Sequence, residues 1–166
     1  MVFNPLIIFL AALIPMAVGF LWYNPKTLGN AWMQAAGLTP EILKGGNMAV
    51  IFGVSFLFAL LLSAFMNGVV IHQNHFFSTL MNEPGLQDPN SEVGKYAADF
   101  VAKYGKNFRT FKHGALHGAI AGIFFALPLL GTTALFERRS FKFIFINAGY
   151  WIITLSLMGG VICAFS

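Results

Sequence analysis

The sequence predicts an all-α, polytopic membrane protein, with four transmembrane helices in a compact bundle and an amphipathic interfacial helix in the second connection. Two observations carry this prediction. Of the 166 residues, 57% are hydrophobic and 10% are charged, and the mean hydropathy is +0.72, whereas a soluble domain carries about 25% charged residues. The apolar residues also gather into four runs of roughly the 20 residues that a helix needs to cross the hydrocarbon core. Because lipid offers no partner to an unpaired backbone amide, each run must be helical.

The four runs cover residues 3–23, 48–71, 113–136 and 143–165 of a single membrane domain, residues 1–166. The first run has neither a basic segment before it nor a small-residue cleavage site, so we expect a retained span and not a signal peptide. Pro15 predicts a kink in this run, and Pro128 lies inside the third. Loop one, residues 24–46, contains a helix start at Thr39-Pro40-Glu41 and a stop at Gly45-Gly46, which predict a short surface helix.

Loop two, residues 72–112, separates the second and third runs. The second helix can extend into it through His72 and His75. Residues 91–111 then carry aromatic and apolar side chains at helical spacing, with charged residues between them. This pattern predicts an amphipathic helix whose aromatic side chains suit the lipid headgroup layer. A helix packed on the other loops is the alternative.

The basic residues flank the hydrophobic runs, as in membrane proteins, so the net charge of +4 does not indicate a nucleic-acid partner. Loop three, residues 137–142, lies on the same side as loop one, while loop two and both termini lie on the other. Each side carries five Lys and Arg residues. The flanks of the individual helices favour, by three helices to one, loops one and three in the cytoplasm and both termini outside.

Small residues are spaced for close helix packing. Gly114, Gly118 and Gly122 recur every four residues in the third run, and Gly159 and Gly160 lie in the fourth. In lipid, small residues allow helices to approach closely. The partner of this face is either a helix of the same chain or a second copy, so internal packing and self-association both stay open. The single cysteine, Cys163, excludes an intramolecular disulfide.

All four histidines lie on the loop-two side. His72 and His75 follow the second run at a spacing of three, and His113 and His117 open the third at a spacing of four, so each pair shares a helix face. Imidazole binds zinc, copper, iron or nickel and relays protons near neutral pH. Neither pair contains the glutamate of the zinc-protease motif. A metal or proton site and histidines satisfied by lipid or loop are both open, and a metal ion is the one cofactor the pattern indicates.

Several motifs together resemble a known family. Gly19-Phe-Leu-Trp-Tyr-Asn-Pro25 closes the first run, and Ala31-Trp-Met33, Gly37-Leu-Thr39, His117-Gly118, Phe136-Glu-Arg-Arg139 and Ile146-Asn-Ala-Gly-Tyr-Trp151 follow. This set resembles the small bacterial membrane proteins catalogued as domain of unknown function 1761. The resemblance implies a four-helix protein of the bacterial inner membrane and supplies no reaction.

Most of the family motifs lie on the side of loops one and three. If the family members share a functional site, we expect it on that side. Its candidate residues are Trp22, Tyr23, Trp32, Glu137, Arg138, Arg139, Asn147, Tyr150 and Trp151. The alternative is that these residues fix topology and depth in the membrane. Asn147 and Asn67 are amides inside or near the hydrocarbon, and each is expected to hydrogen-bond between helices.

Three functions follow from these observations. The first is a structural or accessory subunit that contacts membrane lipids and forms a homo-oligomer or docks on a larger membrane complex. The second is a transporter or channel for a small solute or ion, formed by an oligomer and lined by Asn67, Ser63 or Ser156. The third is a metal-dependent membrane enzyme that uses the histidines. No nucleophile elbow or phosphate-binding glycine loop is present in the sequence. The first function is preferred because of the small-residue faces, the absence of acidic residues within the runs and the amphipathic helix.

Overall fold

The computed structural model describes residues 3–166, and over that range the chain is helical without strands. Four stretches are long and apolar enough to cross a membrane. They are Pro5–Trp22 (α1, Pro5–Ala12, and α2, Ile14–Trp22), Met48–Val70 (α5), Phe111–Phe136 (α8, Phe111–Ala121, η1, Gly122–Ala126, and α9, Leu127–Phe136) and Phe141–Phe165 (α10). These bounds lie within two residues of the predicted runs. The predicted all-helical fold with four membrane-spanning helices is confirmed.

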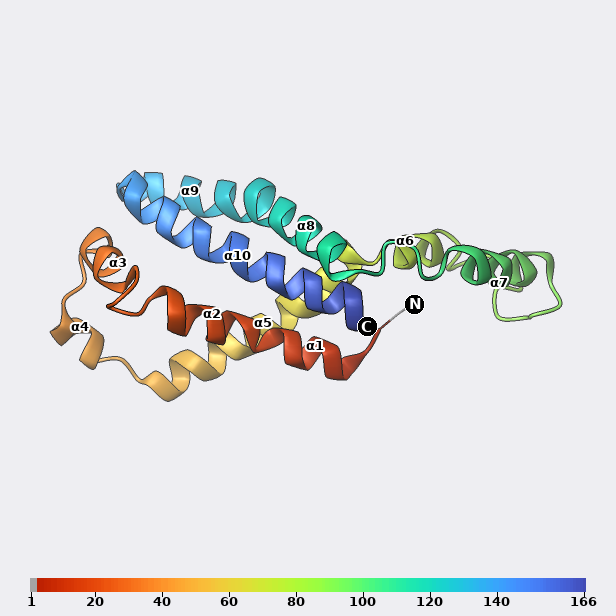
Figure 1. The fold of residues 1–166 in the computed structure, drawn as a ribbon, viewed down its shortest axis with the longest axis horizontal. Coiled ribbons are helices and arrows are strands. Elements are labelled where there is room, and N and C mark those ends of the chain that lie inside the picture. The colour runs from red at the N-terminus through yellow and green to blue at the C-terminus, as the bar shows by residue number, and fades with distance from the viewer. Residues whose placement is uncertain (1–2) are drawn as a thin grey trace.

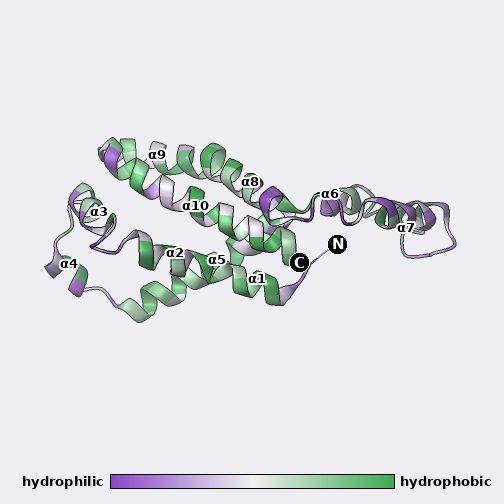
Figure 2. Cartoon of the chain, viewed as in Figure 1, coloured by the Kyte–Doolittle hydropathy of each residue, from purple (hydrophilic) through white to green (hydrophobic). Residues whose placement is uncertain are grey.

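The spans run along the long axis of the molecule (Figure 1). Loop one, with α3 (Gly29–Ala36) and α4 (Pro40–Lys44), lies at one end together with the turn between α9 and α10. The start of α1, the end of α10 and loop two lie at the other end. Hydrophobic residues cover the spans and hydrophilic residues gather at the two ends (Figure 2). Large apolar side chains such as Phe20 and Phe124, each 75% exposed, therefore face the lipid that surrounds the bundle.

The two prolines act differently on their helices. Pro15 sits in the first turn of α2, directly after the break at Leu13 that divides the first span, because proline lacks the amide hydrogen that a helix interior requires. Pro128 lies within a continuous third span. There the five residues of the π-helix, Gly122–Ala126, precede it. The wider turn keeps the proline ring from clashing with the preceding carbonyls, so the helix continues to Phe136.

The glycine face of the third span packs against α10 of the same chain. A Cβ atom at Gly118 would lie 2.5 Å from the carbonyl carbon of Leu155, and one at Gly122 would lie 2.6 Å from the Cα of Ile152. Gly114 and Gly159 face each other backbone to backbone, and the Phe111 ring covers Gly160. The two helices meet this closely only because these positions carry no side chain. The Ser156 hydroxyl crosses the same seam and donates to the Ala115 carbonyl at 2.8 Å.

Helix α5 joins the core only through its second half. Met66 and Val70 are buried against Ile8, Met158 and other residues of α1 and α10. The Ser63 hydroxyl donates to the Ile8 carbonyl at 2.8 Å. Residues 48–55, in contrast, are exposed along the whole first part of the helix. The first half of α5 therefore diverges from the bundle, as the ribbon shows (Figure 1).

Loop two forms a helical hairpin that projects beyond the end of the bundle (Figure 1). Its helices are α6, His72–Thr79, and α7, Glu92–Tyr104. The aromatic face of α7 packs on α6, with the Phe100 and Phe76 rings stacked at 3.7 Å between centroids. The partner of α7 is thus a helix of loop two itself, and the placement of α7 in the headgroup layer stays a prediction. The predicted helix over residues 91–111 also ends earlier, at Tyr104, because the chain must turn through a left-handed Phe108 (φ 61°) before α8 begins.

Loop one holds one expected helix and one that the sequence analysis did not predict. α4 begins as expected, with the Thr39 hydroxyl accepting from the Ile42 amide. α3 was not predicted because its first residue is a glycine without a side-chain cap. Gly29 is required there by packing, since a Cβ atom would lie 2.7 Å from the Asn24 carbonyl carbon.

Candidate functional site

Two of the histidines are aimed by the packing of α8. The Thr110 hydroxyl caps α8 by accepting from the His113 amide, which fixes where the helix begins. His113 and His117 each precede a glycine of the face that packs on α10. One residue turns an α-helix by about 100°. Close packing of the glycines on α10 therefore directs both imidazoles to an adjacent face of α8, toward the junction of α5 and α6.

The third histidine is aimed by a break in the helix that precedes it. α5 ends at Val70, and the buried Ile71 is extended (φ −106°, ψ 97°), so that α6 starts afresh at His72. The next two residues anchor the new helix. The Gln73 side chain donates to the carbonyls of Tyr104 and Asn107 at 3.1 and 2.9 Å, and the Asn74 amide donates to Asn67 Oδ1 at 2.9 Å. His72 therefore lies at the first position of a new, anchored helix and not on a continuation of α5.

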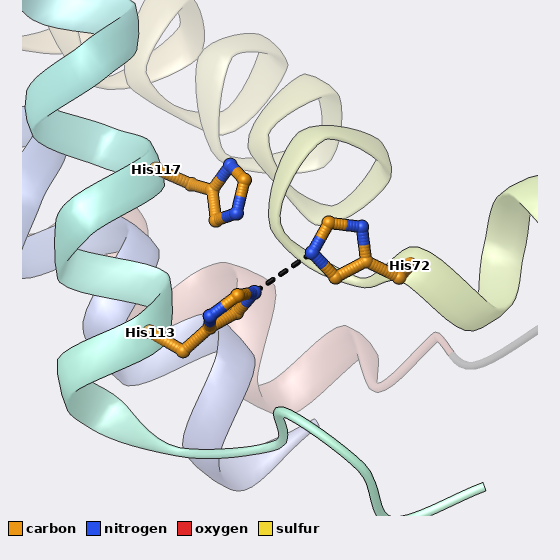
Figure 3. Close-up of side chains that lie close together, drawn as sticks. All are labelled: His72, His113 and His117. Atoms are coloured by element: carbon orange, nitrogen blue, oxygen red, sulfur yellow. Dashed lines mark hydrogen bonds between the residues drawn. The ribbon is translucent and has the colours of Figure 1, made fainter. Parts of the chain in front are cut away.

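The three imidazoles converge on one space (Figure 3). One ligand nitrogen from each of His72, His113 and His117 lies within 4.8 Å of the other two. The Nε2 atoms of His72 and His113 are 2.7 Å apart and share a hydrogen bond. The His117 ring lies 4.9 Å from His72 and 4.5 Å from His113 between centroids. We call these three residues the histidine cluster.

His75, which the sequence grouped with the other three, lies beside the cluster. It is exposed, and its ring centroid is 6.4 Å from that of His72. The group of ligand atoms within 4.8 Å comprises the other three histidines. The Phe108 ring closes one side of the cluster, with centroids 6.0 Å from His72 and 5.0 Å from His113. The sequence analysis did not single out Phe108, whose place depends on its left-handed backbone.

The electrostatics of the cluster favour neutral imidazoles. Partial burial, and after it the charges of His113 and His75, lowers the pKa of His72. The shared hydrogen bond also needs one Nε2 atom as donor and the other as acceptor, so one of the two rings must be neutral. Neutral imidazole is the form that binds a metal ion.

The spacing of the cluster suits a small transition-metal ion. Zinc–nitrogen bonds of about 2.0–2.1 Å in a tetrahedron place the ligand nitrogens roughly 3.3 Å apart. The nitrogens of the cluster bracket that value, from 2.7 Å for the hydrogen-bonded pair to the 4.8 Å limit of the group. To bind one ion, the two hydrogen-bonded nitrogens would have to separate and the wider pairs would have to close. Three protein ligands would leave one position of a tetrahedron open to water or another small ligand.

The residues of the family motifs form a second constellation, at the loop-one end. The Tyr23 hydroxyl donates to Asn147 Oδ1 at 3.0 Å, which is the interhelical bond expected of that amide. The Trp22 indole donates to the Ile146 carbonyl at 3.0 Å, and the Tyr150 hydroxyl donates to the Pro15 carbonyl at 2.9 Å. All three bonds tie the first span to α10. Burial, and after it the neighbouring Tyr150, raises the pKa of Tyr23.

The remaining motif residues lie around this constellation. The Trp32 ring of α3 packs on Tyr23 at 5.1 Å, and Trp151 packs on Tyr150 at 5.0 Å. Arg139 donates to the Ala36 carbonyl at 2.8 Å and pairs with Glu137 at 3.4 Å. Arg138 is exposed in a left-handed turn (φ 57°). These contacts join loop three to α3 and leave the guanidinium groups at the end of the bundle.

Fold and site together define a multi-pass helical membrane protein with an imidazole cluster at one end and an aromatic, basic constellation at the other. A family model described as a protein of unknown function, DUF1761, matches residues 6–163, and the chain belongs to this family. The resemblance drawn from the sequence motifs is thereby confirmed. No curated protein and no solved structure matches the chain.

Proposed function

We propose that this membrane protein binds a transition-metal ion through His72, His113 and His117. The observation that carries the proposal is the convergence of three imidazole nitrogens, within 4.8 Å of one another, from two separate helices. His72 precedes His113 by 41 positions and His117 by 45, so local sequence does not bring His72 to the other two. The lowered pKa of His72 supports the same conclusion, because neutral imidazole is the binding form.

The ligand set restricts the class of metal. Imidazole suits zinc, copper, iron and nickel, whereas magnesium and calcium prefer carboxylate and carbonyl oxygens. The cluster consists of histidines alone among the described residues. Without a carboxylate, a divalent ion would keep its full charge at this site. Zinc is the first ion to test, since three imidazoles and one open position form a known zinc environment.

The test is a metal titration of tag-free protein in mild detergent, because a histidine tag would itself bind the ion. We expect one zinc ion per chain by calorimetry and by elemental analysis after purification. Substituting His113→Ala and His117→Ala together should weaken binding at least about a hundredfold, since even outer-sphere partners of metal ligands are worth 10–100-fold. His75→Ala is the matched control and should retain the ion. Equal binding by the double variant and the parent would refute the proposal.

The other two functions drawn from the sequence receive less support. The accessory function was favoured by the small-residue faces, the absence of buried acidic residues and the amphipathic helix, and of these faces the one with Gly114, Gly118 and Gly122 packs inside the chain. The pore was to be lined by Asn67, Ser63 or Ser156. Asn67 Oδ1 accepts from the Asn74 amide, and the two hydroxyls donate to the Ile8 and Ala115 carbonyls. A homo-oligomer or docking on a larger complex would have to use other surfaces. The copy number in native mass spectra tests this directly.

For its location we propose the bacterial inner membrane, with loops one and three in the cytoplasm. The basic flanks of three of the four helices support this orientation. The histidine cluster would then face the outside. Cys163 is buried, so a cysteine introduced at Asn90 in the loop-two hairpin would be the accessible thiol. A membrane-impermeant maleimide should label Asn90→Cys in intact cells and leave Lys26→Cys unlabelled, and the reverse pattern would invert the topology.

A further inference from the structure

A groove opens between the first and second spans at the loop-one end. It exists because the first half of α5 diverges from the bundle, while α2 stays tied to α10 by the bonds of Trp22 and Tyr150. Its volume is about 540 Å³, which lies within the roughly 300–1,000 Å³ of ligand pockets. The lining residues come from four helices and include Gly19, Tyr23, Trp32, Phe52, Ser55 and Tyr150.

The chemistry of the groove selects an apolar occupant. The hydroxyls of Tyr23 and Tyr150 donate to Asn147 and to the Pro15 carbonyl, so these residues present mainly their rings to the groove. Two exposed aromatic residues line its edge: Phe20 of α2, which is 75% exposed, and Phe52 of α5, which is 54% exposed. The groove therefore opens sideways into the hydrocarbon layer. The molecules available at that depth are the acyl chains of lipids.

Basic residues of loops one and three lie beyond the end of the groove. Trp32 bounds it there, and Ala36, one helical turn further along α3, accepts a hydrogen bond from Arg139. Loops one and three together carry five basic residues, Lys26, Lys44, Arg138, Arg139 and Lys142, against two acidic ones, Glu41 and Glu137. An acyl chain that lies in the groove carries its headgroup to this end of the bundle. A phosphate there would be attracted by the excess positive charge.

We propose that the groove between α2 and α5 is a binding site for one acyl chain of an anionic phospholipid, with the phosphate at the basic loop-one end. A second copy of the chain is the competing occupant, which its effect on copy number tests. The basic residues of loops one and three favour the anionic lipid. The proposal stands independently of the histidine cluster, which lies at the opposite end.

The test compares two identical substitutions at glycines of the first and second spans. A Cβ atom at Gly19 would meet only the Tyr150 ring among the described residues, at the ordinary contact distance of 3.7 Å, so a larger side chain there must occupy the groove. Gly53 lies on the exposed part of α5, with no described atom within 4 Å of such a Cβ atom. Gly19→Leu fills the groove and Gly53→Leu is the control. Ser55→Trp fills it from the opposite wall and replaces Gly19→Leu should that variant fail to fold.

The probes are phosphatidylglycerol and phosphatidylcholine with the same acyl chains, added to delipidated protein and read by native mass spectrometry. We expect the parent to retain one phosphatidylglycerol per chain, in at least about fivefold preference to phosphatidylcholine, a difference of about 1 kcal/mol. Gly19→Leu should lose this lipid, Gly53→Leu should keep it, and Arg139→Gln should reduce the headgroup preference.

Three outcomes would overturn the proposal. Equal retention of both lipids by the parent would mean that the basic end does not select the headgroup. Equal retention by the Gly19 and Gly53 variants would mean that the lipid lies elsewhere on the surface. A change in copy number caused by Gly19→Leu or Ser55→Trp would make the groove an interface between copies.

Discussion

A methyl group at Gly118 tests whether the seam between α8 and α10 sets both the fold and the histidine cluster. In Gly118→Ala the new Cβ atom would lie 2.5 Å from the carbonyl carbon of Leu155 and 2.7 Å from the Cα of Ser156. Both neighbours are backbone atoms, so no side-chain rotation can relieve the clash. Ordinary contact begins at 3.4 Å, and the Leu155 carbonyl oxygen lies closer to the new atom than its carbon does, so α8 must recede from α10 by more than about 0.9 Å at this point.

The magnitude follows from what this displacement breaks. The bond from Ser156 to the Ala115 carbonyl, 2.8 Å long, would stretch to more than about 3.7 Å if the displacement is along it, beyond hydrogen-bonding distance. Overpacking a well-packed core costs about 1–3 kcal/mol, and an interhelical hydrogen bond in a membrane is worth about 1 kcal/mol. We therefore expect Gly118→Ala to lower the free energy of unfolding by about 2–4 kcal/mol.

The assay is equilibrium unfolding in mixed micelles by titration with sodium dodecyl sulfate, followed by circular dichroism. Gly53→Ala is the matched control, because its methyl group meets open space and a glycine-to-alanine change in a helix is otherwise neutral or favourable. His117 adjoins Gly118, so the same displacement should weaken zinc binding in whatever fraction stays folded. If the two alanine variants unfold at the same detergent fraction, the packing argument is wrong.

Three further predictions use the same preparations. Tyr23→Phe should lower the free energy of unfolding by about 1 kcal/mol, because it removes the bond to Asn147. Adding Tyr23→Phe to Asn147→Leu should cause no further loss of stability. Additive losses in the double variant would contradict the coupling. Zinc affinity should fall on acidification, because the neutral form of His72 binds the ion and is lost as the pH drops through its folded-state pKa, which burial lowers below the ordinary 6.5. Calorimetry between pH 7.5 and 5 checks this, and a flat profile would count against histidine ligands. Gln73→Ala should release the end of α7 and the residues that follow it from α6, and limited proteolysis should then cut loop two faster than in the parent.

Several elements could be predicted from the sequence because their causes are local. Each span is a sum of apolar side chains over consecutive residues, so hydropathy locates it without knowledge of its neighbours. The start of α4 follows from the Thr39 cap and Pro40. The end of α7 could not be placed in this way. Aromatic spacing continues to Phe111, but the chain leaves the helix after Tyr104 to reach the start of α8.

The candidate sites likewise combine features with local causes, which the sequence predicts, and features that depend on how the helices cross. Spacing alone put His113 and His117 on one face, and the motifs pointed to Tyr23, Asn147 and Tyr150. The bonds among the latter, and the groove beside them, depend on how α2, α5 and α10 cross, which no local pattern encodes. For the same reason Ser55 carried no sequence signal, and Phe108 was predicted as part of the amphipathic pattern and not as a neighbour of the histidines.

The sequence by itself determined that this chain is a four-span helical membrane protein, that its glycines pack closely, and that two histidines share a helix face. These properties depend on residues within one helix. Only the tertiary structure decided that the glycines face α10 of the same chain, that His72 meets His113 and His117, and that α5 leaves a groove beside α2. In lipid, helices associate through close packing and not through hydrophobic patterning, so an apolar sequence fixes its spans without fixing their partners.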